Sequence, residues 1–266
     1  MAYKGNNVIL TIPYYDPTGK YNRAFQHQLE TLESVFDEIC LSVVPPTGKD
    51  NTDFIHNLRQ EGCVVFDNEP NLPIGDHSRN ALRLAIEQAQ AQRSIFFGFL
   101  DRMLFDLETS WRTSFLQDIE RYQAASYMIF ERSQFAWSTH PRNYREMEQM
   151  VSQTCELLYG KFIELSAGAF ILSPSTASTI LSQSTSSSYE IWGEWILLAM
   201  KNNIPITTKR VDWLAWEDPY WEQVEPDILK RTRETSREEI VKRIKLNMPI
   251  MLMMTEERFR SLRARD

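Results

Sequence analysis

Short apolar runs alternate with segments of helical periodicity in the first part of the chain. Four runs have the length of buried strands and end at polar residues or proline: 7–13, 39–44, 63–66 and 94–100. The segments between them carry helix signals: 25–39, where apolar residues fall mostly three or four positions apart, 53–60, and a segment that Asp76 is expected to cap. Strands that alternate with helices over short links predict a mostly parallel sheet with helices on both faces.

The second part of the chain is less regular. Its expected helices are 107–124, 143–159, 174–182 and 190–202. Its expected strands are 126–130, 162–172 with a bend at Gly168, and one or two strands within 204–216. The polar stretch 131–141 is expected to be a loop, and the Ser/Thr-rich stretch 182–188 a mobile loop. Together these elements predict an α/β fold with a mixed, mostly parallel sheet.

The composition changes near residue 225. Residues 1–224 carry a formal net charge of −10 and are expected to form one α/β domain, whereas residues 225–266 carry +3 and are expected to form a helical appendage. A basic helical tail of this kind docks on its own domain, contacts another subunit, or rests on a membrane surface. Docking or homo-oligomer contact is the commoner outcome, and we expect one of these two.

Composition narrows the class of protein. The net charge of −7 argues against nucleic acid as the main partner, and Cys40, Cys63 and Cys155 lack metal-ligand or disulfide spacing, which predicts buried, reduced thiols. The polar start at residues 1–7 lacks the apolar core of a signal peptide, and no apolar run approaches the roughly 20 residues that cross a bilayer. We therefore expect a soluble, cytoplasmic protein. Phosphate-binding glycine loops, dinucleotide motifs and nucleophile-elbow motifs are absent from the sequence.

Two acids follow the ends of predicted strands. Asp16 follows the first apolar run and Asp101 the fourth. Because ligands of open α/β sheets bind outside the carboxyl ends of the strands, we expect these acids to converge on one crevice. Asp101 suits a Mg²⁺ or Mn²⁺ ion that neutralises a diphosphate, and Pro13, Tyr14 and Asp16 suit a base and ribose pocket. The alternatives are a helix cap or surface turn at Asp101 and a simple turn at Asp16.

Three further charged residues lie near predicted helix starts. Arg79 is placed to bind phosphate, or alternatively to pair with Asp76 on the surface. Glu190 and Glu194 are four residues apart, so one helix face presents both carboxylates, and either suits the general base of a transfer reaction. The alternative is a solvated acidic face with Trp192 packed underneath.

Two groups in the second part of the chain suit a sugar or its phosphate. His140 and Arg142 lie in the polar loop and suit metal or phosphate binding, although a lone loop histidine more often does neither. Trp216 belongs to a group of tryptophans with Glu217 and Asp218. Aromatic faces suit sugar rings and acids suit their hydroxyls, but packing of the core or of a lid explains the tryptophans equally well.

The order of these segments resembles the GT-A nucleotide-diphospho-sugar transferases. The resemblance rests on five segments: the strand Val8–Pro13 with Tyr14-Tyr15-Asp16, the helix start Gly75-Asp76-His77-Ser78-Arg79-Asn80-Ala81-Leu82, Phe99-Leu100-Asp101-Arg102 in the place of the metal-binding Asp-x-Asp, Gly168-Ala169-Phe170, and Glu194-Trp195. Leu100-Asp101-Arg102, Thr139-His140-Pro141-Arg142 and Trp192-Gly193-Glu194-Trp195 are similar to a group of bacterial glycosyltransferase-like proteins. The resemblance spans residues 7–218 and leaves the tail uncovered.

The resemblance implies transfer of a sugar from a nucleoside diphosphate to a hydroxyl acceptor. In this hypothesis the nucleotide contacts are Pro13, Tyr14, Asp16, Arg79, Asp101 and Arg102, with Mg²⁺ or Mn²⁺ at Asp101. Glu194 is the first candidate base and Glu190 the second. The residues expected around the donor or acceptor sugar are His140, Arg142, Gly168, Trp192 and Trp216.

The sequence departs from the family pattern at one position. Met103 replaces the second acid of Asp-x-Asp, so three possibilities stay open: Asp101 holds the metal alone, Arg102 supplies part of its charge, or the site does not catalyse transfer. The last possibility describes a non-catalytic sugar-nucleotide binder or interaction module. A sugar-1-phosphate nucleotidyltransferase is a lower-ranked alternative, because the segment Tyr14–Gly19 is neither glycine-rich nor basic.

Overall fold

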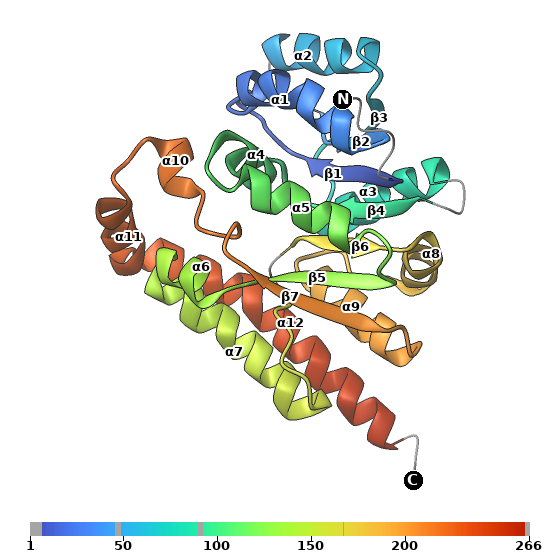
Figure 1. The fold of residues 1–266 in the computed structure, drawn as a ribbon. Helices are drawn as coiled ribbons and strands as arrows, with labels where there is room; N and C mark the ends of the chain where they lie inside the picture. The colour runs from blue at the N-terminus through green and yellow to red at the C-terminus, as the bar shows by residue number, and fades with distance from the viewer. Residues whose placement is uncertain (1–6, 46–48, 90–92, 167, 264–266) are drawn as a thin grey trace.

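The computed structural model describes residues 7–45, 49–89, 93–166 and 168–263 (Figure 1). Within them, one sheet has the strand order β3-β2-β1-β4-β6-β5-β7. Its strands are β1 (Val8–Tyr14), β2 (Glu38–Val43), β3 (Val64–Asp67), β4 (Ser94–Phe97), β5 (Tyr127–Arg132), β6 (Phe170–Leu172) and β7 (Ile206–Val211). The helices are α1 (Asn22–Val35), α2 (Lys49–Gln60), α3 (Ile74–Gln88), α4 (Leu100–Glu108), α5 (Arg112–Tyr122), α6 (Gln134–Thr139), α7 (Arg142–Tyr159), α8 (Pro174–Gln183), α9 (Ile191–Lys201), α10 (Asp218–Glu222), α11 (Pro226–Thr235) and α12 (Arg237–Arg263).

The strand directions bring most carboxyl ends to one edge of the sheet. β1 pairs in parallel with β2 and β4, β2 with β3, and β5 with β7, whereas β6 is antiparallel to both of its neighbours. The chain first winds outward from β1 through β2 to β3, and then crosses to the other side of β1 to form β4. The winding direction therefore reverses between β1 and β4, and such a reversal opens a crevice at the carboxyl edge.

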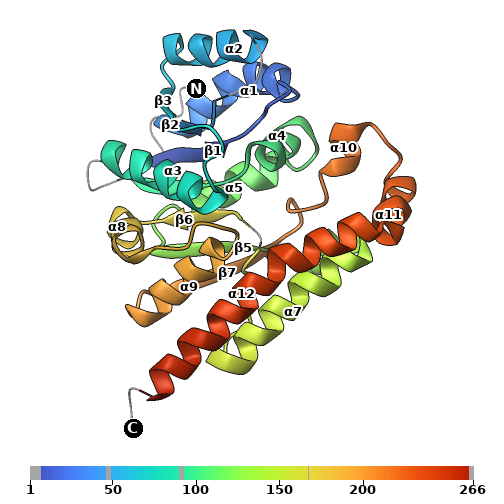
Figure 2. The same cartoon turned by 180° about the vertical axis from the view of Figure 1, so that it is seen from behind.

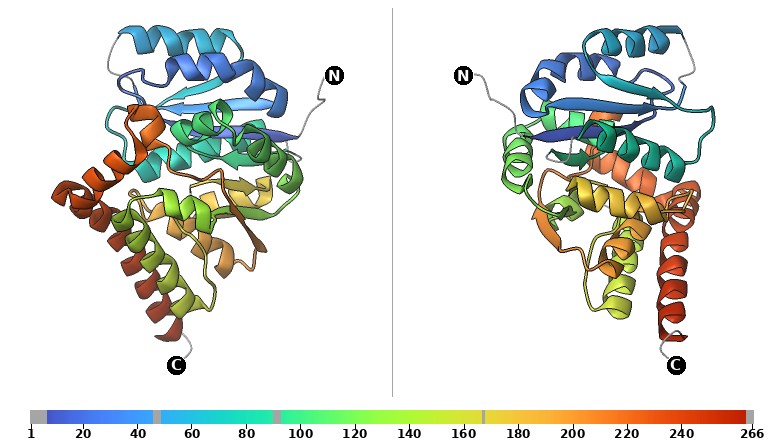
Figure 3. Two further views of the ribbon diagram at one scale, coloured as in Figure 1. Left: turned by 60° about the vertical axis from the view of Figure 1, so that its left-hand side comes forward. Right: turned by 90° about the vertical axis from the view of Figure 1, so that its right-hand side faces the viewer.

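Helices cover both faces of the sheet (Figures 2 and 3). Alternate residues of β1 point to opposite faces: Val8, Leu10 and Ile12 pack in the core beneath α1, α4 and α5, and Ile9 packs in the core beneath α3, α8 and α9. The mostly parallel α/β architecture predicted from the sequence is confirmed. The three cysteines are buried and unpaired, as expected.

Several expected elements differ in detail. The strand expected at 94–100 ends earlier, at Phe97, because α4 begins at Leu100. α5 forms most of the helix expected at 107–124, and the first two residues of that stretch instead end α4. The expected loop 131–141 contains α6, which Ser133 caps by accepting from the Ala136 amide. The expected strand 162–172 is reduced to β6. The bend at Gly168 is present: this residue has a φ of +67°, and a Cβ there would lie 2.4 Å from the Phe99 ring.

The predicted cap at Asp76 is wrong. α3 begins two residues earlier, at Ile74, with Pro73 at the N-cap position. Asp76 instead lies inside the first turn, where its negative charge is favourable near the positive end of the helix dipole.

The tail docks on the rest of the chain. α12 lies along α7 and also packs against α9 (Figure 2). Ile250 and Met254 of α12 belong to the core beneath α9, and a Cβ at Gly193 would lie 2.6 Å from Ile250 Cγ2. The boundary at residue 225 and homo-oligomer contact through these helices stay predictions. Among the helices in the described ranges, none has the length and apolarity to cross a membrane.

Candidate functional site

Asp16 lies after β1 at the carboxyl edge, where its side chain holds its own turn together. Its two carboxylate oxygens accept from the backbone amides of Lys20 at 3.0 Å and Tyr21 at 2.8 Å, and from the Thr18 hydroxyl at 3.3 Å. Asp16 is 4% exposed. The turn that the sequence offered as an alternative is therefore present. Any ligand contact by Asp16 is additional to this structural role.

Pro13 and Tyr14 are the last two residues of β1 and are buried. The Tyr14 ring packs in the core beneath α1, and its hydroxyl donates to Asn22 Oδ1 at 3.1 Å. In this arrangement the ring stacks on the protein's own core, so a role for Tyr14 in base stacking stays a prediction.

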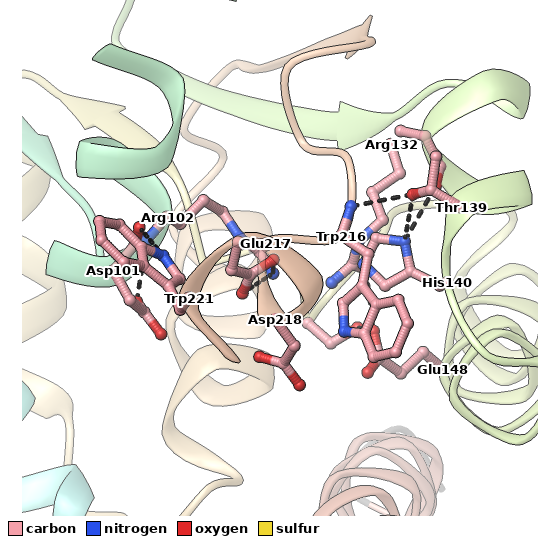
Figure 4. A network of polar contacts seen from close by, with 12 residues as sticks. Asp101, Arg102, Arg132, Thr139, His140, Glu148, Trp216, Glu217, Asp218 and Trp221 are labelled. Atoms are coloured by element: carbon pink, nitrogen blue, oxygen red, sulfur yellow. Dashed lines mark hydrogen bonds and ion pairs between the residues drawn. The ribbon is translucent and has the colours of Figure 1, made fainter. Parts of the chain in front are cut away.

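Asp101 lies in the first turn of α4, directly beyond β4 (Figure 4). Its carboxylate accepts from the Arg102 amide at 2.9 Å, and its backbone carbonyl accepts from Trp221 Nε1 at 2.9 Å. Burial and the neighbouring negative charge of Glu217 raise the pKa of Asp101 to about 6. The Arg102 guanidinium is directed to Glu217, with Nη2 at 3.1 and 3.3 Å from the two carboxylate oxygens.

The Tyr21 side chain shows that acids from three segments converge here. Its ring packs against that of Trp221 with centroids 5.0 Å apart. Burial raises the pKa of the Tyr21 hydroxyl, and four nearby carboxylates raise it further: Asp101, Asp16, Asp218 and Glu217. The ends of β1 and β4 and the start of α10 therefore carry one acidic group, at the edge where the reversal of the sheet predicts a crevice; this group is hereafter called the Asp101 crevice. The sequence identified both strand-end acids but gave no reason to select Tyr21.

Phe99 joins two other predicted residues to the Asp101 crevice. It precedes α4 and packs edge-on against Trp192 at a centroid distance of 5.4 Å. The same ring occupies the space that a side chain at Gly168 would need. Gly168, Trp192 and the end of β4 are therefore neighbours through Phe99, a residue that sequence reasoning did not select. The Trp192 indole nitrogen is buried and has no hydrogen-bond partner among the described residues.

Arg79 and Glu194 lie together around the Ser/Thr-rich loop. Arg79 pairs with Asp76, the alternative considered from the sequence, and also donates to the Ser186 carbonyl. Glu194 Oε1 accepts from the amides of Thr185 at 2.8 Å and Ser186 at 3.1 Å, and its Oε2 accepts from the Ser184 hydroxyl at 2.5 Å. Both side chains therefore fix this loop against α3 and α9.

Glu190 differs from Glu194 in having a carboxylate oxygen without a hydrogen-bond partner. It lies at the N-cap position of α9, and its Oε2 atom is buried without a hydrogen-bond partner in the described part of the chain. Of the two predicted bases, Glu190 is thus the one that keeps an unengaged carboxylate oxygen.

His140 and Trp216 are brought together on the other side of Arg102. The His140 Nδ1–H donates to the Ala136 carbonyl at 2.9 Å, and the Trp216 amide donates to Thr139 Oγ1 at 2.9 Å. Burial, and then the positive charge of nearby arginines, lowers the pKa of His140 well below its usual value. The imidazole is therefore neutral, and its buried Nε2 has no partner among the described residues.

Arg142 does not join this group. Its side chain is 71% exposed and pairs with Glu146 one helical turn along α7. The loop position predicted from the sequence is in fact the first residue of α7.

A buried ionic network adjoins His140 (Figure 4). Arg132, the last residue of β5, donates to Glu148 at 2.8 Å and also pairs with Glu164. Glu148 is in turn 3.4 Å from Arg243 of α12. The sequence gave no indication of this network, because Arg132 fell in the expected loop 131–141 and its partners come from α7, the segment before β6, and the tail.

Trp216 also lines an aromatic cavity of about 530 Å³. The other aromatic walls are Phe105, Trp111, Phe135 and Tyr220, and the polar groups at its rim include Ser138, Thr139, Asp227 and Lys230. Such a cavity suits a ring with an apolar face and polar substituents.

The side chains near Asp101 offer a metal ion few ligands. The residues that the structure describes contain no group of three or more His, Cys, Asp or Glu side chains arranged to hold a metal. Met103, which replaces the second acid, is buried in the core. A divalent ion at Asp101 would therefore take most of its ligands from a bound diphosphate and water.

The sequence matches no model of a known protein family and no curated protein. A solved structure described as a mycobacterial protein is similar over 80% of this chain and 67% of its own, with 10% identity and a TM-score of 0.52. Two structures of glucosyl-3-phosphoglycerate synthase from Mycobacterium tuberculosis, one with UDP and one with Mn²⁺, UDP-glucose and phosphoglyceric acid, each match 78% of this chain and 71% of their own, at 9% and 10% identity and TM-scores of 0.45 and 0.46. Likeness at this level concerns the fold alone, and it agrees with the α/β fold class predicted from the sequence.

Proposed function

We propose that this protein is a glycosyltransferase that takes its sugar from a nucleoside diphosphate and passes it to a hydroxyl acceptor. The observation that supports this most is the convergence of Asp16, Asp101 and Glu217 at the reversal point between β1 and β4. Crevices at such reversal points are where open α/β sheets bind nucleotides and related ligands.

The charges of the crevice favour a diphosphate that arrives with a cation. Arg102 is paired with Glu217 and Arg233 Nη2 lies 4.0 Å from Asp218, whereas Asp101 forms no salt bridge among the described residues. A bare diphosphate would be repelled by this surplus of carboxylates. A bound Mg²⁺ or Mn²⁺ ion would supply the missing positive charge, and Asp101 is the residue that would hold it.

The remaining roles follow from which groups are unengaged. Glu190, with its unpartnered Oε2, is the proposed base that takes the proton of the acceptor hydroxyl, in place of Glu194, whose oxygens are occupied by the loop. The acceptor is proposed to lie toward the aromatic cavity beside Trp216. Trp192 and Gly168 lie beside Phe99, next to the end of β4.

A non-catalytic sugar-nucleotide binder is the second candidate. Two observations favour it: Glu194 is used to hold the Ser184–Ser186 loop, and Met103 leaves the metal with a single protein carboxylate at the strand end. Binding would then be retained without transfer.

The test compares Asp101→Asn with Asp53→Asn, a matched change at an exposed position of α2. A panel of nucleoside-diphosphate sugars is titrated with and without Mn²⁺ by calorimetry, and release of nucleoside diphosphate is followed with simple hydroxyl acceptors. We expect one sugar nucleotide to bind in the presence of Mn²⁺. Asp101→Asn should weaken it by about tenfold or more, which corresponds to one lost charged contact, and Asp53→Asn should have no effect.

The outcomes separate the candidates. Binding with release of nucleoside diphosphate supports the transferase. Binding without release or transfer supports the non-catalytic binder. If no sugar nucleotide binds, or if both variants bind as well as the unmodified protein, the crevice is not a nucleotide site.

A further inference from the structure

A second cavity lies at the far end of the sheet, beyond the carboxyl ends of β5 and β7. It has a volume of about 510 Å³, and its wall includes Arg132, Trp137, Arg145, Phe162, Glu164 and Arg210. None of these residues belongs to the Asp101 crevice. The volume is within the range of about 300–1,000 Å³ that is typical of small-molecule sites.

The acids of this cavity have their oxygens occupied. Glu164 accepts from the Arg132 amide at 2.7 Å and from the Arg132 guanidinium. Glu131 accepts from the Glu164 amide at 3.0 Å and has Arg210 Nε at 4.0 Å from its other oxygen. Burial also raises the pKa of Glu164 to about 7, which reduces its negative charge near neutral pH. The acids therefore offer few free acceptors to a ligand.

The arginines of this cavity, in contrast, keep free donors. The Arg132 side chain is 3% exposed, and its Nε has no hydrogen-bond partner, although its Nη1 is engaged by Glu148 and Glu164. Arg145 projects from α7 into the cavity wall, and in the described ranges its side chain forms no ion pair or hydrogen bond. A buried donor without an acceptor is costly, so the site favours a ligand that supplies one.

Aromatic side chains set the shape of the space beside these donors. The Trp137 ring lies against the Arg132 guanidinium, 4.6 Å from ring centroid to Cζ, and holds it in place. The Phe162 ring is 37% exposed and lines the same cavity. A flat ring attached to the anionic group would therefore find an apolar surface to cover.

We propose that this cavity binds a small organic anion, in which a carboxylate or phosphate contacts Arg145 and Arg132 and an attached ring packs against Trp137 and Phe162. A carboxylate and a phosphate satisfy the same guanidinium donors, and Arg145 provides the charge that neither Glu131 nor Glu164 neutralises.

The test uses four probes on the intact chain: benzoate, phenyl phosphate, inorganic phosphate and the neutral benzyl alcohol. Binding is measured by calorimetry for the unmodified protein, for Arg145→Gln and for Arg142→Gln. Arg142 is a matched control, because it lies three residues away on α7, is 71% exposed and does not line the cavity.

We expect benzoate or phenyl phosphate to bind more tightly than benzyl alcohol and inorganic phosphate, and the tighter of the two anions identifies the preferred head group. Arg145→Gln should weaken that anion by about tenfold, the effect of one charge-assisted contact, and Arg142→Gln should leave it unchanged. The proposal is overturned if neither ring-bearing anion binds, if benzyl alcohol binds as tightly as they do, or if the two arginine variants behave alike.

Discussion

Glu148 of α7 is the centre of the buried ionic network, and removal of its charge tests whether that network holds the tail in place. Its Oε2 accepts from Arg132 Nη1 at 2.8 Å and from the Ser166 hydroxyl at 2.9 Å, and its Oε1 is 3.4 Å from Arg243 Nη1. One side chain, 7% exposed, thus joins β5, α7 and α12.

The substitution Glu148→Gln keeps the size of the side chain and removes its charge. The amide oxygen can still accept from one arginine, but the amide nitrogen then faces the second arginine or Ser166 as a donor. Loss of one member of a buried ion pair costs about 3–5 kcal/mol, because the remaining charge stays buried. Glu146→Gln is the matched control: its pair with Arg142 is more than half exposed on both sides, and such pairs contribute about 0–1 kcal/mol.

The free energy of unfolding is measured by urea titration followed by tryptophan fluorescence at neutral pH. We expect Glu148→Gln to be less stable than Glu146→Gln by at least about 2 kcal/mol, the difference between the two ranges above. Equal stabilities would refute the idea that Glu148 organises this end of the molecule.

The pH dependence of the free energy of unfolding gives a second test of the comparison between the unmodified protein and Glu148→Gln. Burial opposes ionisation of Glu148, but the positive charges of Arg132 and Arg243 outweigh it and lower its pKa below the ordinary value of 4.5. The stability that the ionised form contributes is therefore present above pH 4.5 and is lost as the pH falls through the folded-state pKa. The difference between the unmodified protein and Glu148→Gln should shrink in the same range.

Three other substitutions have defined outcomes. Gly193→Ala would place a Cβ 2.6 Å from Ile250 Cγ2, so we expect a loss of about 1–3 kcal/mol in urea unfolding, and an unchanged midpoint would show that α12 does not pack there as described. Gly75→Ala would place a Cβ 2.5 Å from the Ser187 carbonyl carbon, so limited proteolysis should cut the 182–188 loop faster than in the unmodified protein; equal rates would contradict this. Burial lowers the pKa of His140 well below 6.5, so the stability that the neutral imidazole contributes is present above pH 6.5 and is lost as the pH falls. The urea midpoint of His140→Asn should therefore change less than that of the unmodified protein between neutral and mildly acidic pH. Equal pH dependence of the two midpoints would exclude a contribution of His140 to the pH dependence of stability.

The sequence predicts the strand ends well because the signal there is local. The apolar run at 94–100 stops at an acid, and although β4 itself ends at Phe97 and Asp101 lies in the first turn of α4, the strand rule alone places Asp101 at the carboxyl edge of the sheet. The turn at Asp16 was also predicted from the sequence as an alternative, because Asp-Pro-Thr-Gly favours a turn in which the aspartate accepts hydrogen bonds from nearby backbone amides.

The parts that the sequence did not predict depend on long-range pairing. Glu194 was correctly placed on a helix, although Glu190 lies at the N-cap position just before it. The donors that occupy Glu194 come from a loop that only the packing of α8 on α9 brings within reach. Arg132 follows Glu131 at the end of β5, and its partners Glu148 and Glu164 are 16 and 32 residues away along the chain. The short helix α6 did have a local signal, because Ser133 stands at its N-cap.

The two ends of the sheet's carboxyl edge differ in charge: one is rich in acids, and the other has arginine donors without acceptors. At the β1–β4 end, the four acids near Tyr21 outnumber Arg102 and Arg233, the arginines that pair with them in the described ranges, so a ligand must bring positive charge or hydroxyl donors. At the β5–β7 end, the acids have their oxygens occupied, and Arg145 and Arg132 need an acceptor. A single small anion cannot satisfy both ends, so Asp101→Asn and Arg145→Gln should each affect a different class of ligand. If Arg145→Gln also weakened the sugar nucleotide by about tenfold, one extended ligand would bridge the two ends, and the separation argued from their charges would be wrong.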